Sequence, residues 1–487
     1  MKTAMPAVSL RRIKDLPGPR AWPLLGSALQ VKPARIHQDI EAWARQYGAL
    51  FRVKLGLTQM LVVADHEAVL AMLRDRPDGF RRAHKLREVA DEMGASPGLF
   101  TSEGSAWQAQ RRMVLASFAP GQIRAYFPAL VKVTQRLHAR WQRAAIDGVS
   151  IDLQADLKRF TVDAIAGLAF GTEVNSLESG DDPIHQHLDI IFAATYRRVM
   201  SPLPYWRWVS LPADRQLKRS LAALQAAVHD FMAQARARLQ ADPALALAPR
   251  NLLEAMLVAA DRSGAEVDER DVAGNVSTML FAGEDTTANT LAWLIYLLRR
   301  HPETLARVRD EVRRCVPDFG PDFGPDFGPD AVADLSPLGV EQLDGLAYLE
   351  ACVTEAMRLK PVAPFLGLEA LRDTTVADVA VPAGTLVWCV LRHDSVDEHR
   401  FANAEAFDPQ RWLNGADKRI AMPFGAGPRI CPGRYLALLE IKLAMAMLLR
   451  SFEIESVAPP QGGEAGEVMS FTMNPVELRM RLSPRRP

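Results

Sequence analysis

Cys431 lies in the segment PFGAGPRICPGRYLALLE, where glycine, proline and arginine surround a single thiol and an apolar-striped segment follows. A cysteine in such a place can be a buried core residue, half of a disulfide, a zinc ligand, a nucleophile or the axial ligand of a metal cofactor. Each possibility makes a different demand on the rest of the chain, so the other residues must decide between them.

The remaining cysteines are Cys315, Cys352 and Cys389, and no two cysteines form a C-x-x-C pair. This spacing argues against a Cys-rich zinc site. So few cysteines in 487 residues do not suggest a disulfide scaffold, which favours a reducing compartment. A nucleophile needs a base nearby, and the nearest histidines, His393 and His399, carry no supporting motif.

A metal ligand fits the local sequence better. Gly425, Gly427 and Gly433 let the backbone approach a large planar group. Pro432 suits the first position of a helix, where its missing N–H costs nothing, so we expect the helix to begin there. A thiolate before that helix would be stabilised by the free N–H groups of Gly433 and the residues that follow.

The string F-G-x-G-x-R-x-C-x-G at 424–433 resembles the heme-binding loop of the cytochrome P450 family, the heme-thiolate monooxygenases. The resemblance implies that Cys431 is the iron ligand of heme b. It also implies that Phe424 covers this ligand, that Gly425 and Gly433 border the heme, and that Arg429 binds a heme propionate.

Two further motifs resemble the family's structural network. Glu355 and Arg358 form E-x-x-R, and the segment FDPQRW at 407–412 places Arg411 before an aromatic residue. Residues one helical turn apart can pair, although such a pair alone is usually a solvated surface bridge. The resemblance implies that the three residues hold the chain segment that carries the cysteine loop.

The sequence AGEDTT at 282–287 resembles the family's oxygen-activation motif. Ala282 and Gly283 are small and would leave room for dioxygen above the heme. A threonine hydroxyl can leave its own helix bond to stabilise bound oxygen, and an acid beside it can relay protons. The resemblance implies that Asp285 and Thr286 are catalytic.

Trp107 and Arg111 lie four residues apart, on one face of a helix, and resemble the family's segment that reaches a propionate. Many bacterial members carry a propionate-binding arginine where this chain has Leu368, which leaves the full set of propionate contacts open. A basic turn at Arg81, Arg82 and Lys85 is expected to be solvated, with anchoring of a substrate carboxylate as the alternative.

The periodicity predicts a mainly helical chain with a minor β part. Helical patterns fill most of 102–310, including a long helix from Glu269 to Arg300, and a further helix is expected at 340–359. Strands are expected near 51–65, 374–391 and the C-terminus. We expect a flexible leader over 1–15 and one P450 domain over 16–487, with the PDFG repeats in a loop insertion at 316–335.

The composition excludes some classes of function. The 58 Lys and Arg residues balance 58 Asp and Glu residues, which argues against a dedicated nucleic-acid binder. The N-terminus lacks the apolar run of a signal peptide or membrane anchor, so we expect a cytoplasmic protein. We also expect a monomer. The residues expected to line the substrate pocket are mostly apolar, which predicts a hydrophobic substrate; they include Phe281, Ala282, Phe365, Leu366 and Phe471.

The resemblance implies a monooxygenase that inserts one oxygen atom of dioxygen into a hydrophobic small molecule, by hydroxylation or epoxidation. In a chain of 487 residues only 56 follow Cys431, so we expect electrons from a separate ferredoxin or flavodoxin with an NAD(P)H-dependent reductase. Arg111 and Arg112 are candidates for its docking surface. The alternatives are a peroxygenase or isomerase of the same fold, and a heme sensor without turnover.

Overall fold

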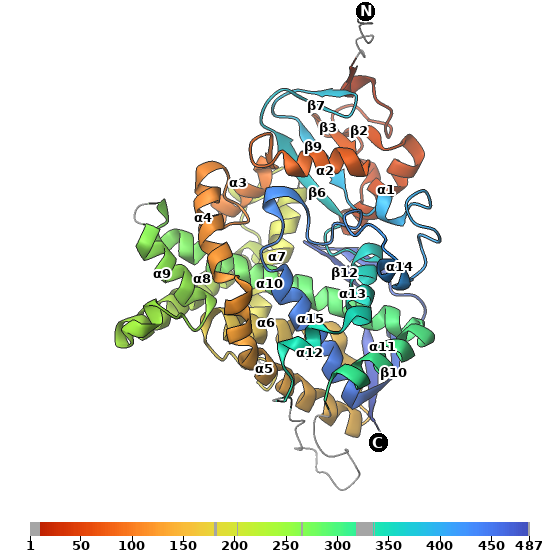
Figure 1. Ribbon diagram of the computed structural model, residues 1–487. Coiled ribbons are helices and arrows are strands. Elements are labelled where there is room, and N and C mark those ends of the chain that lie inside the picture. Colours follow the sequence, from red (N-terminus) through yellow and green to blue (C-terminus); the bar gives the residue numbers. More distant parts are fainter. Residues whose placement is uncertain are drawn as a thin grey trace, which may run out of the picture.

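The computed structural model describes residues 10–179, 183–201, 203–263, 266–317, 335 and 337–485. They form a large helical body and a smaller part rich in strands, at the bottom and the top of Figure 1. The prediction of a mainly helical fold with a minor β part is confirmed. Among the described residues, every helix is too short or too polar to cross a lipid bilayer.

The strand-rich part is built on a five-stranded sheet with the order β2-β3-β9-β6-β4. Only β3 and β9 run parallel, and the other neighbours are antiparallel. The helices α1 (Ile36–Tyr47), α2 (His66–Arg74) and α3 (His84–Glu92) accompany it. The strands are β2 (Leu50–Leu55), β3 (Thr58–Val63), β9 (Leu386–Val390), β6 (Phe365–Ala370) and β4 (Phe80–Arg82).

Three smaller sheets complete the β structure. The first joins β1 (Arg11–Arg12), β8 (Val379–Val381) and β7 (Thr374–Val376), and the second joins β10 (Phe452–Ala458), β13 (Arg479–Pro484) and β5 (Ile151–Asp152). The third is a hairpin of β11 (Glu467–Met469) and β12 (Met473–Pro475). The turn of this hairpin contacts the long central helix of the helical body.

The long helix α10 (Glu269–Arg300) runs through the middle of the body (Figure 1), with the bounds that its sequence predicted. The Asp268 side chain accepts a hydrogen bond from the Asp271 N–H at the first turn, and His301-Pro302 ends the helix. The helices that follow α3, apart from α10, are α4 (Gly104–Ser117), α5 (Pro120–Ile146), α6 (Leu153–Ile165), α7 (Pro183–Met200), α8 (Pro212–Ala241), α9 (Leu252–Ser263), α11 (Pro302–Cys315), α12 (Val340–Asp344), α13 (Ala347–Leu359), α14 (Gln410–Leu413) and α15 (Arg434–Ser451).

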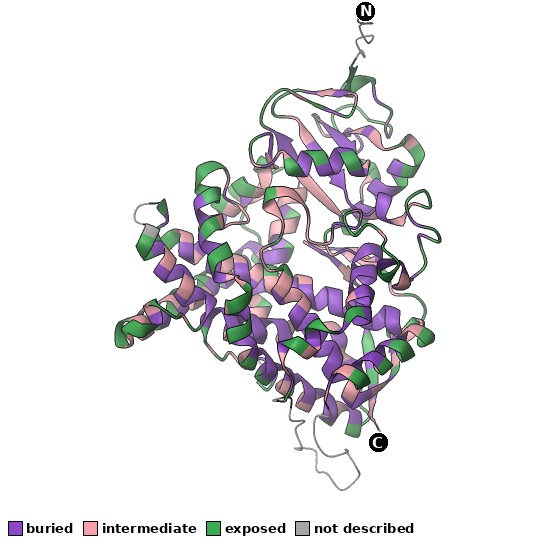
Figure 2. Cartoon of the chain, viewed as in Figure 1, coloured by how far each residue is buried: buried purple, intermediate pink, exposed green. Residues whose placement is uncertain are grey.

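The apolar core follows from this arrangement. Figure 2 shows buried residues concentrated where the helices of the body face one another, with exposed residues on their outer sides. Most residues of α10 from Thr287 to Leu298 are buried, and so are most of α15 from Leu439 to Leu449. A helix that is apolar on nearly all sides must be surrounded by other elements, and this holds both helices in place.

Three predicted boundaries differ from the structure. The helix expected at 340–359 is split into α12 and α13 around Gly345. The helix after the cysteine begins at Arg434 with Gly433 as its N-cap, so Pro432 is not its first residue as predicted. Residues 11–15, expected in a flexible leader, instead form β1 and a short 3-10 turn, and Arg11 bonds to Asp378. The PDFG repeats lie outside the described residues, apart from the ends of their loop.

The network expected around Glu355 is present and fully enclosed. Glu355 and Arg358 are 0% exposed and form a two-bond ion pair at 2.7 and 2.8 Å within α13. The same carboxylate accepts hydrogen bonds from Arg411 Nε at 3.0 Å and from Trp412 Nε1 at 2.9 Å. Arg358 in turn donates to the main-chain carbonyls of Ser395, Ala404 and Ala406. One carboxylate therefore ties α13 to the irregular chain that precedes the cysteine loop.

Replacing Glu355 by Gln should leave two buried guanidinium groups without their counter-charge. Removal of one partner of a buried ion pair typically costs about 3–5 kcal/mol, so we expect a drop of that size in the free energy of unfolding. Urea unfolding followed by tryptophan fluorescence measures it. Asp417→Asn, which removes an exposed pair with Arg419, serves as the control. Unfolding of Glu355→Gln at the wild-type urea concentration would contradict the assignment.

Candidate functional site

The cysteine loop is a tight turn fixed by glycine. The Cys431 N–H donates to the Phe424 carbonyl at 3.0 Å, which closes the loop. Gly427 has φ +69, and a Cβ there would lie 2.3 Å from the Leu73 carbonyl oxygen of α2. A larger residue at this position would push the loop away from the strand-rich part, because it is both left-handed and in close contact. Gly425, with φ +73, meets no such contact.

Burial and the neighbouring groups act in opposite directions on the pKa of the Cys431 thiol. The side chain is accessible to solvent, yet loss of hydration near the protein raises the pKa of the thiol from its ordinary value. The Gly433 N–H and the cations Arg111 and Arg434 act in the opposite direction. The hydrogen bond from Gly433 is the one expected from the sequence, even though the helix begins two residues later than predicted.

The residues expected near the propionates come together beside this loop. The Arg429 guanidinium lies over the Trp107 ring, 4.6 Å from its centroid, and donates to the Ser102 carbonyl at 2.7 Å. Arg111, one turn along α4 from Trp107, donates to the Ile430 carbonyl at 2.7 Å. Helix α4 and the cysteine loop are thereby joined by two arginines, one from each side.

More positive charge is buried here than the sequence predicted. Arg76 and Arg82 lie close to Arg429, and Glu103 is the acidic group that faces them. Burial and the two neighbouring arginines lower the pKa of Arg82 to about 9. Among the described residues, Nε and Nη2 of Arg76 and Nε of Arg429 are buried without a hydrogen-bond partner. A group that brings carboxylates would satisfy these donors, so the residues present fit the propionates of a heme.

The expectation of a solvated basic turn at residues 81–85 is therefore wrong for Arg82. This side chain packs over the Phe100 ring at 3.7 Å, while Arg81 bonds to Glu369 and Lys85 to the Ser201 carbonyl. Strand β4 pairs with β6 so that Arg82 lies directly opposite Leu368. Cross-strand partners share a face of the sheet, so Arg82 presents a cation on the face where position 368 has a leucine. The leucine at this position was the available sequence signal for a cation from a neighbouring strand.

The segment AGEDTT, the expected oxygen-activation motif, lies in α10. Its Thr286 hydroxyl and its Asp285 carboxyl point to different sides of this helix. Thr286 lines the cavity described below and its Oγ1 donates to the Ala282 carbonyl at 2.6 Å. Asp285 is 3% exposed and points toward α6 and the turn between β11 and β12. A Cβ on Gly283 would lie 2.4 Å from Ile165, so glycine lets α10 pack closely on α6.

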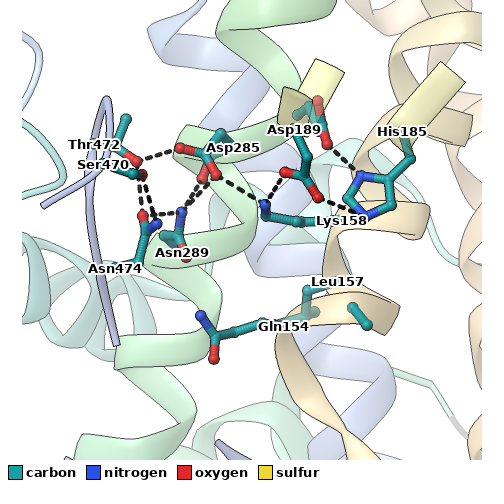
Figure 3. Close-up of polar contacts among 12 residues, drawn as sticks. Gln154, Leu157, Lys158, His185, Asp189, Asp285, Asn289, Ser470, Thr472 and Asn474 are labelled. Atoms are coloured by element: carbon teal, nitrogen blue, oxygen red, sulfur yellow. Dashed lines mark hydrogen bonds and ion pairs between the residues drawn. The ribbon is translucent and has the colours of Figure 1, made fainter. Parts of the chain in front are cut away.

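A chain of charges leads from Asp285 to the surface. Lys158 of α6 lies 3.4 Å from Asp285 and 2.6 Å from Asp189, whose side chain is 46% exposed (Figure 3). His185 joins Asp189 to Glu284, the residue before Asp285. Burial raises the pKa of Glu284 to about 7, against the lowering effect of His185 and Lys158. Sequence reasoning missed these residues because α6 and α7 are distant from the motif in the chain.

An apolar cavity of about 500 Å³ lies between α10, α8, α7 and the segment 86–101. Three of the residues expected in the substrate pocket, Phe281, Ala282 and Phe471, line this cavity together with Thr286 and Thr472. Phe365 and Leu366 do not; Phe365 packs on Trp388 instead, at 5.9 Å between ring centroids. The prediction missed the face of α8, whose helical repeat was the available signal: Leu221, Leu224, Gln225, Val228, His229 and Met232.

Comparison with known proteins identifies the arrangement. The sequence profile of the family Cytochrome P450 matches residues 16–480. The chain belongs to the cytochrome P450 family. It is therefore an oxidoreductase of a heme-binding monooxygenase family.

The relatives are distant but cover nearly the whole chain. Pentalenene oxygenase of Streptomyces avermitilis is 27% identical over 478 residues, which are 96% of this chain and 97% of the relative. Cyclooctat-9-en-7-ol 5-monooxygenase of Streptomyces melanosporofaciens is 28% identical, over 90% of this chain and 89% of the relative. A self-sufficient P450 monooxygenase of Oidiodendron maius is 26% identical over 96% of this chain, which spans only 42% of that protein.

Replacing Arg76 by Met should weaken retention of heme by this P450. Loss of a charge-assisted hydrogen bond to a carboxylate lowers the affinity for heme, and we expect the rate of heme loss to rise roughly tenfold. Transfer of heme to apomyoglobin measures the rate. Arg372→Met is the matched control, because Arg372 is an exposed arginine of the same part of the chain that bonds to Asp75. Equal rates for Arg76→Met and the control would show that Arg76 does not contact the propionates.

The raised pKa of Glu284 also predicts a pH dependence of stability. A carboxyl group whose folded pKa exceeds the unfolded value favours folding at low pH, and this contribution is lost as pH rises through about 7. The thermal midpoint of the wild type should therefore fall relative to Glu284→Gln between about pH 5 and pH 8. Calorimetry at several pH values measures the difference. A constant difference between the two proteins would contradict the assignment.

Proposed function

We propose that this P450 inserts one oxygen atom of dioxygen into a hydrophobic small molecule, with heme b bound through Cys431. The observation that carries the proposal is the apolar cavity, whose inner wall includes Ala282 and Thr286 of the oxygen-activation motif. Aliphatic and aromatic side chains make up most of this wall, while Gln225, His229 and Arg270 lie at its outer end. Such a lining favours a substrate with a large apolar body.

The protein's own residues would bind and orient the reactants. When bound, the heme supplies the activation of dioxygen. Cys431 would provide the thiolate ligand, and Trp107, Arg111, Arg429, Arg76 and Arg82 would surround the propionates. Thr286 would offer a hydroxyl to oxygen after leaving the Ala282 carbonyl, and Asp285 would hold a proton near it.

Electrons would come from a separate protein, a ferredoxin or flavodoxin with its NAD(P)H-dependent reductase. The Arg112 side chain is 66% exposed on α4, the helix that contacts the cysteine loop, and it pairs with Glu266 at 2.7 Å. Arg111 is turned inward to the Ile430 carbonyl, so Arg112 is the better of the two docking candidates.

The substrate can be sought by spectral titration. Pentalenene and cyclooctat-9-en-7-ol, the compounds named in two relatives, are the first to test because both relatives align along nearly their whole length. Fatty acids, steroids and aromatic polyketides form the comparison set. Displacement of a water ligand from the ferric heme shifts its visible spectrum. Binding of a compound can therefore be detected before any turnover is measured.

Replacing Cys431 by Ser should abolish the long-wavelength Soret band that a thiolate-bound heme shows when it is reduced and exposed to carbon monoxide. Cys352→Ser is the control, since Cys352 is a buried cysteine of α13 and not part of the loop. Survival of the band in Cys431→Ser would place the ligand elsewhere. Turnover by the wild type with hydrogen peroxide, and none with reductase, NAD(P)H and oxygen, would instead favour a peroxygenase.

A further inference from the structure

Two residues of α7 and one residue of α10 bring metal-binding side chains together. His185 and Asp189 lie one turn apart on the same face of α7, with His185 Nε2 3.4 Å from Asp189 Oδ2 (Figure 3). Glu284 of α10 faces them, and its Oε1 lies 2.5 Å from His185 Nδ1. Each of the three residues offers one ligand atom, and these atoms lie within 4.8 Å of one another. Imidazole and carboxylate groups are the ligands that Zn²⁺ and related transition-metal ions bind in proteins.

One oxygen of the Glu284 carboxyl group, Oε2, is buried without a hydrogen-bond partner among the described residues. The whole side chain is enclosed, since Glu284 is 0% exposed. Because Oε1 of the same carboxyl group contacts His185, Oε2 lies within the cluster as well. Buried polar atoms in folded proteins nearly always have a partner, so an oxygen that the chain itself leaves unpaired favours a bound ligand at this place.

The charges around the cluster favour a cation as that ligand. When ionised, Glu284, Asp189 and Asp285 bring three negative charges, and Lys158 brings one positive charge. With His185 neutral, the group therefore carries two negative charges in excess, which one divalent cation would neutralise. Lys158 Nζ lies 2.6 Å from Asp189 Oδ1, whereas His185 faces Oδ2, so the oxygen on the histidine side is left for a metal. A contact of this kind to the other oxygen orients a ligating carboxylate.

A cation can reach the cluster from solvent and would take the place of a proton. The Asp189 side chain is 46% exposed and lies at the outer end of the cluster. The His185–Glu284 hydrogen bond holds a proton, and a metal in its place would widen the separation of Nδ1 and Oε1 to about 3 Å. Binding would release that proton. Mg²⁺ and Ca²⁺ prefer oxygen ligands alone, so the histidine favours Zn²⁺ or a related ion.

We propose that His185, Asp189 and Glu284 form a binding site for one divalent transition-metal ion, with Zn²⁺ as the best fit, and that the bound ion fastens α7 to α10. The cluster offers three protein ligands, so water would complete a tetrahedral site. Ile191 and Phe192 of α7 line the apolar cavity, and the ion would therefore restrain one of its walls. Neither the cysteine loop nor turnover takes part, so the site is independent of the proposed monooxygenase activity.

Calorimetric titration of the heme-loaded, chelator-treated protein with Zn²⁺ tests the site. At about pH 8, above the pKa of about 7 that burial gives Glu284, the wild type should bind one Zn²⁺ that His185→Gln does not bind. Glutamine can still hydrogen-bond to Glu284, but it is a poor zinc ligand. Mg²⁺ should not compete for the site. An equal number of bound Zn²⁺ ions in wild type and His185→Gln would overturn the proposal.

His393→Gln is the matched control, because His393 lies in a second group of metal-ligating side chains, with Asp394 and Asp397. The two carboxylates of that group are already used within the fold, since each accepts a main-chain N–H at 2.8 Å. His393→Gln should therefore bind as many Zn²⁺ ions as the wild type. Loss of a Zn²⁺ ion in His393→Gln but not in His185→Gln would place the metal in the wrong cluster and refute the assignment.

Anomalous diffraction at the zinc absorption edge locates the ion, and hydrogen exchange measures its effect on α7. We expect a peak between α7 and α10, and slower exchange of α7 amides when Zn²⁺ is added to the wild type but not to His185→Gln. If His185→Gln folds poorly, Asp189→Asn repeats the test at the exposed end of the site, where binding should weaken by about tenfold or more. A peak elsewhere on the protein, or α7 exchange that Zn²⁺ does not change, would contradict the proposal.

Discussion

The carboxylate of Glu355 is the interaction on which the site depends. It is enclosed on all sides and accepts hydrogen bonds from Arg358, Arg411 and Trp412 at once. Two of these donors, Arg411 and Trp412, belong to the short helix α14 in the segment before the cysteine loop. A loop can hold a ligand in one position only if its base is rigid. The buried ion pair supplies that rigidity at the cost of desolvating three charged groups.

A second constraint is the positive charge gathered between the sheet and the cysteine loop. Burial lowers the pKa of Arg82 and of Arg429, neighbouring arginines lower it further, and Glu103 offsets only part of the effect. A fold that keeps such a cluster needs an anion to complete it. The same region receives Gly427, whose lack of a side chain allows the loop to reach α2. The arginine cluster and the close contact of the loop with α2 therefore lie in the same region, between the strand-rich part and the helical body.

Much of this could be predicted from the sequence, and the reasons are local. The bounds of α10 follow from its N-terminal cap and from Pro302, and the cysteine loop follows from residues close together in the chain. The prediction that the helix after the cysteine begins at Pro432 was wrong. Proline suits a first helical turn, but this preference alone does not show that Gly433 is the N-cap. Contacts between distant segments could not be predicted. Arg82 opposite Leu368, Lys158 beside Asp285 and Thr472 on Asp285 depend on strand register and helix packing, which composition and periodicity do not encode.

Two neighbouring residues in the turn between β11 and β12, Phe471 and Thr472, make different contacts. Phe471 packs against Phe192 and forms part of the cavity wall, while Thr472 contacts the acid of the central helix. Movement of one residue along a short turn moves the other, because the backbone between them has little freedom. Enlargement of the cavity through this turn would therefore also disturb the hydrogen bond between Thr472 and Asp285. The shape of the cavity and the contacts of the central-helix acid are not separable at this point of the fold.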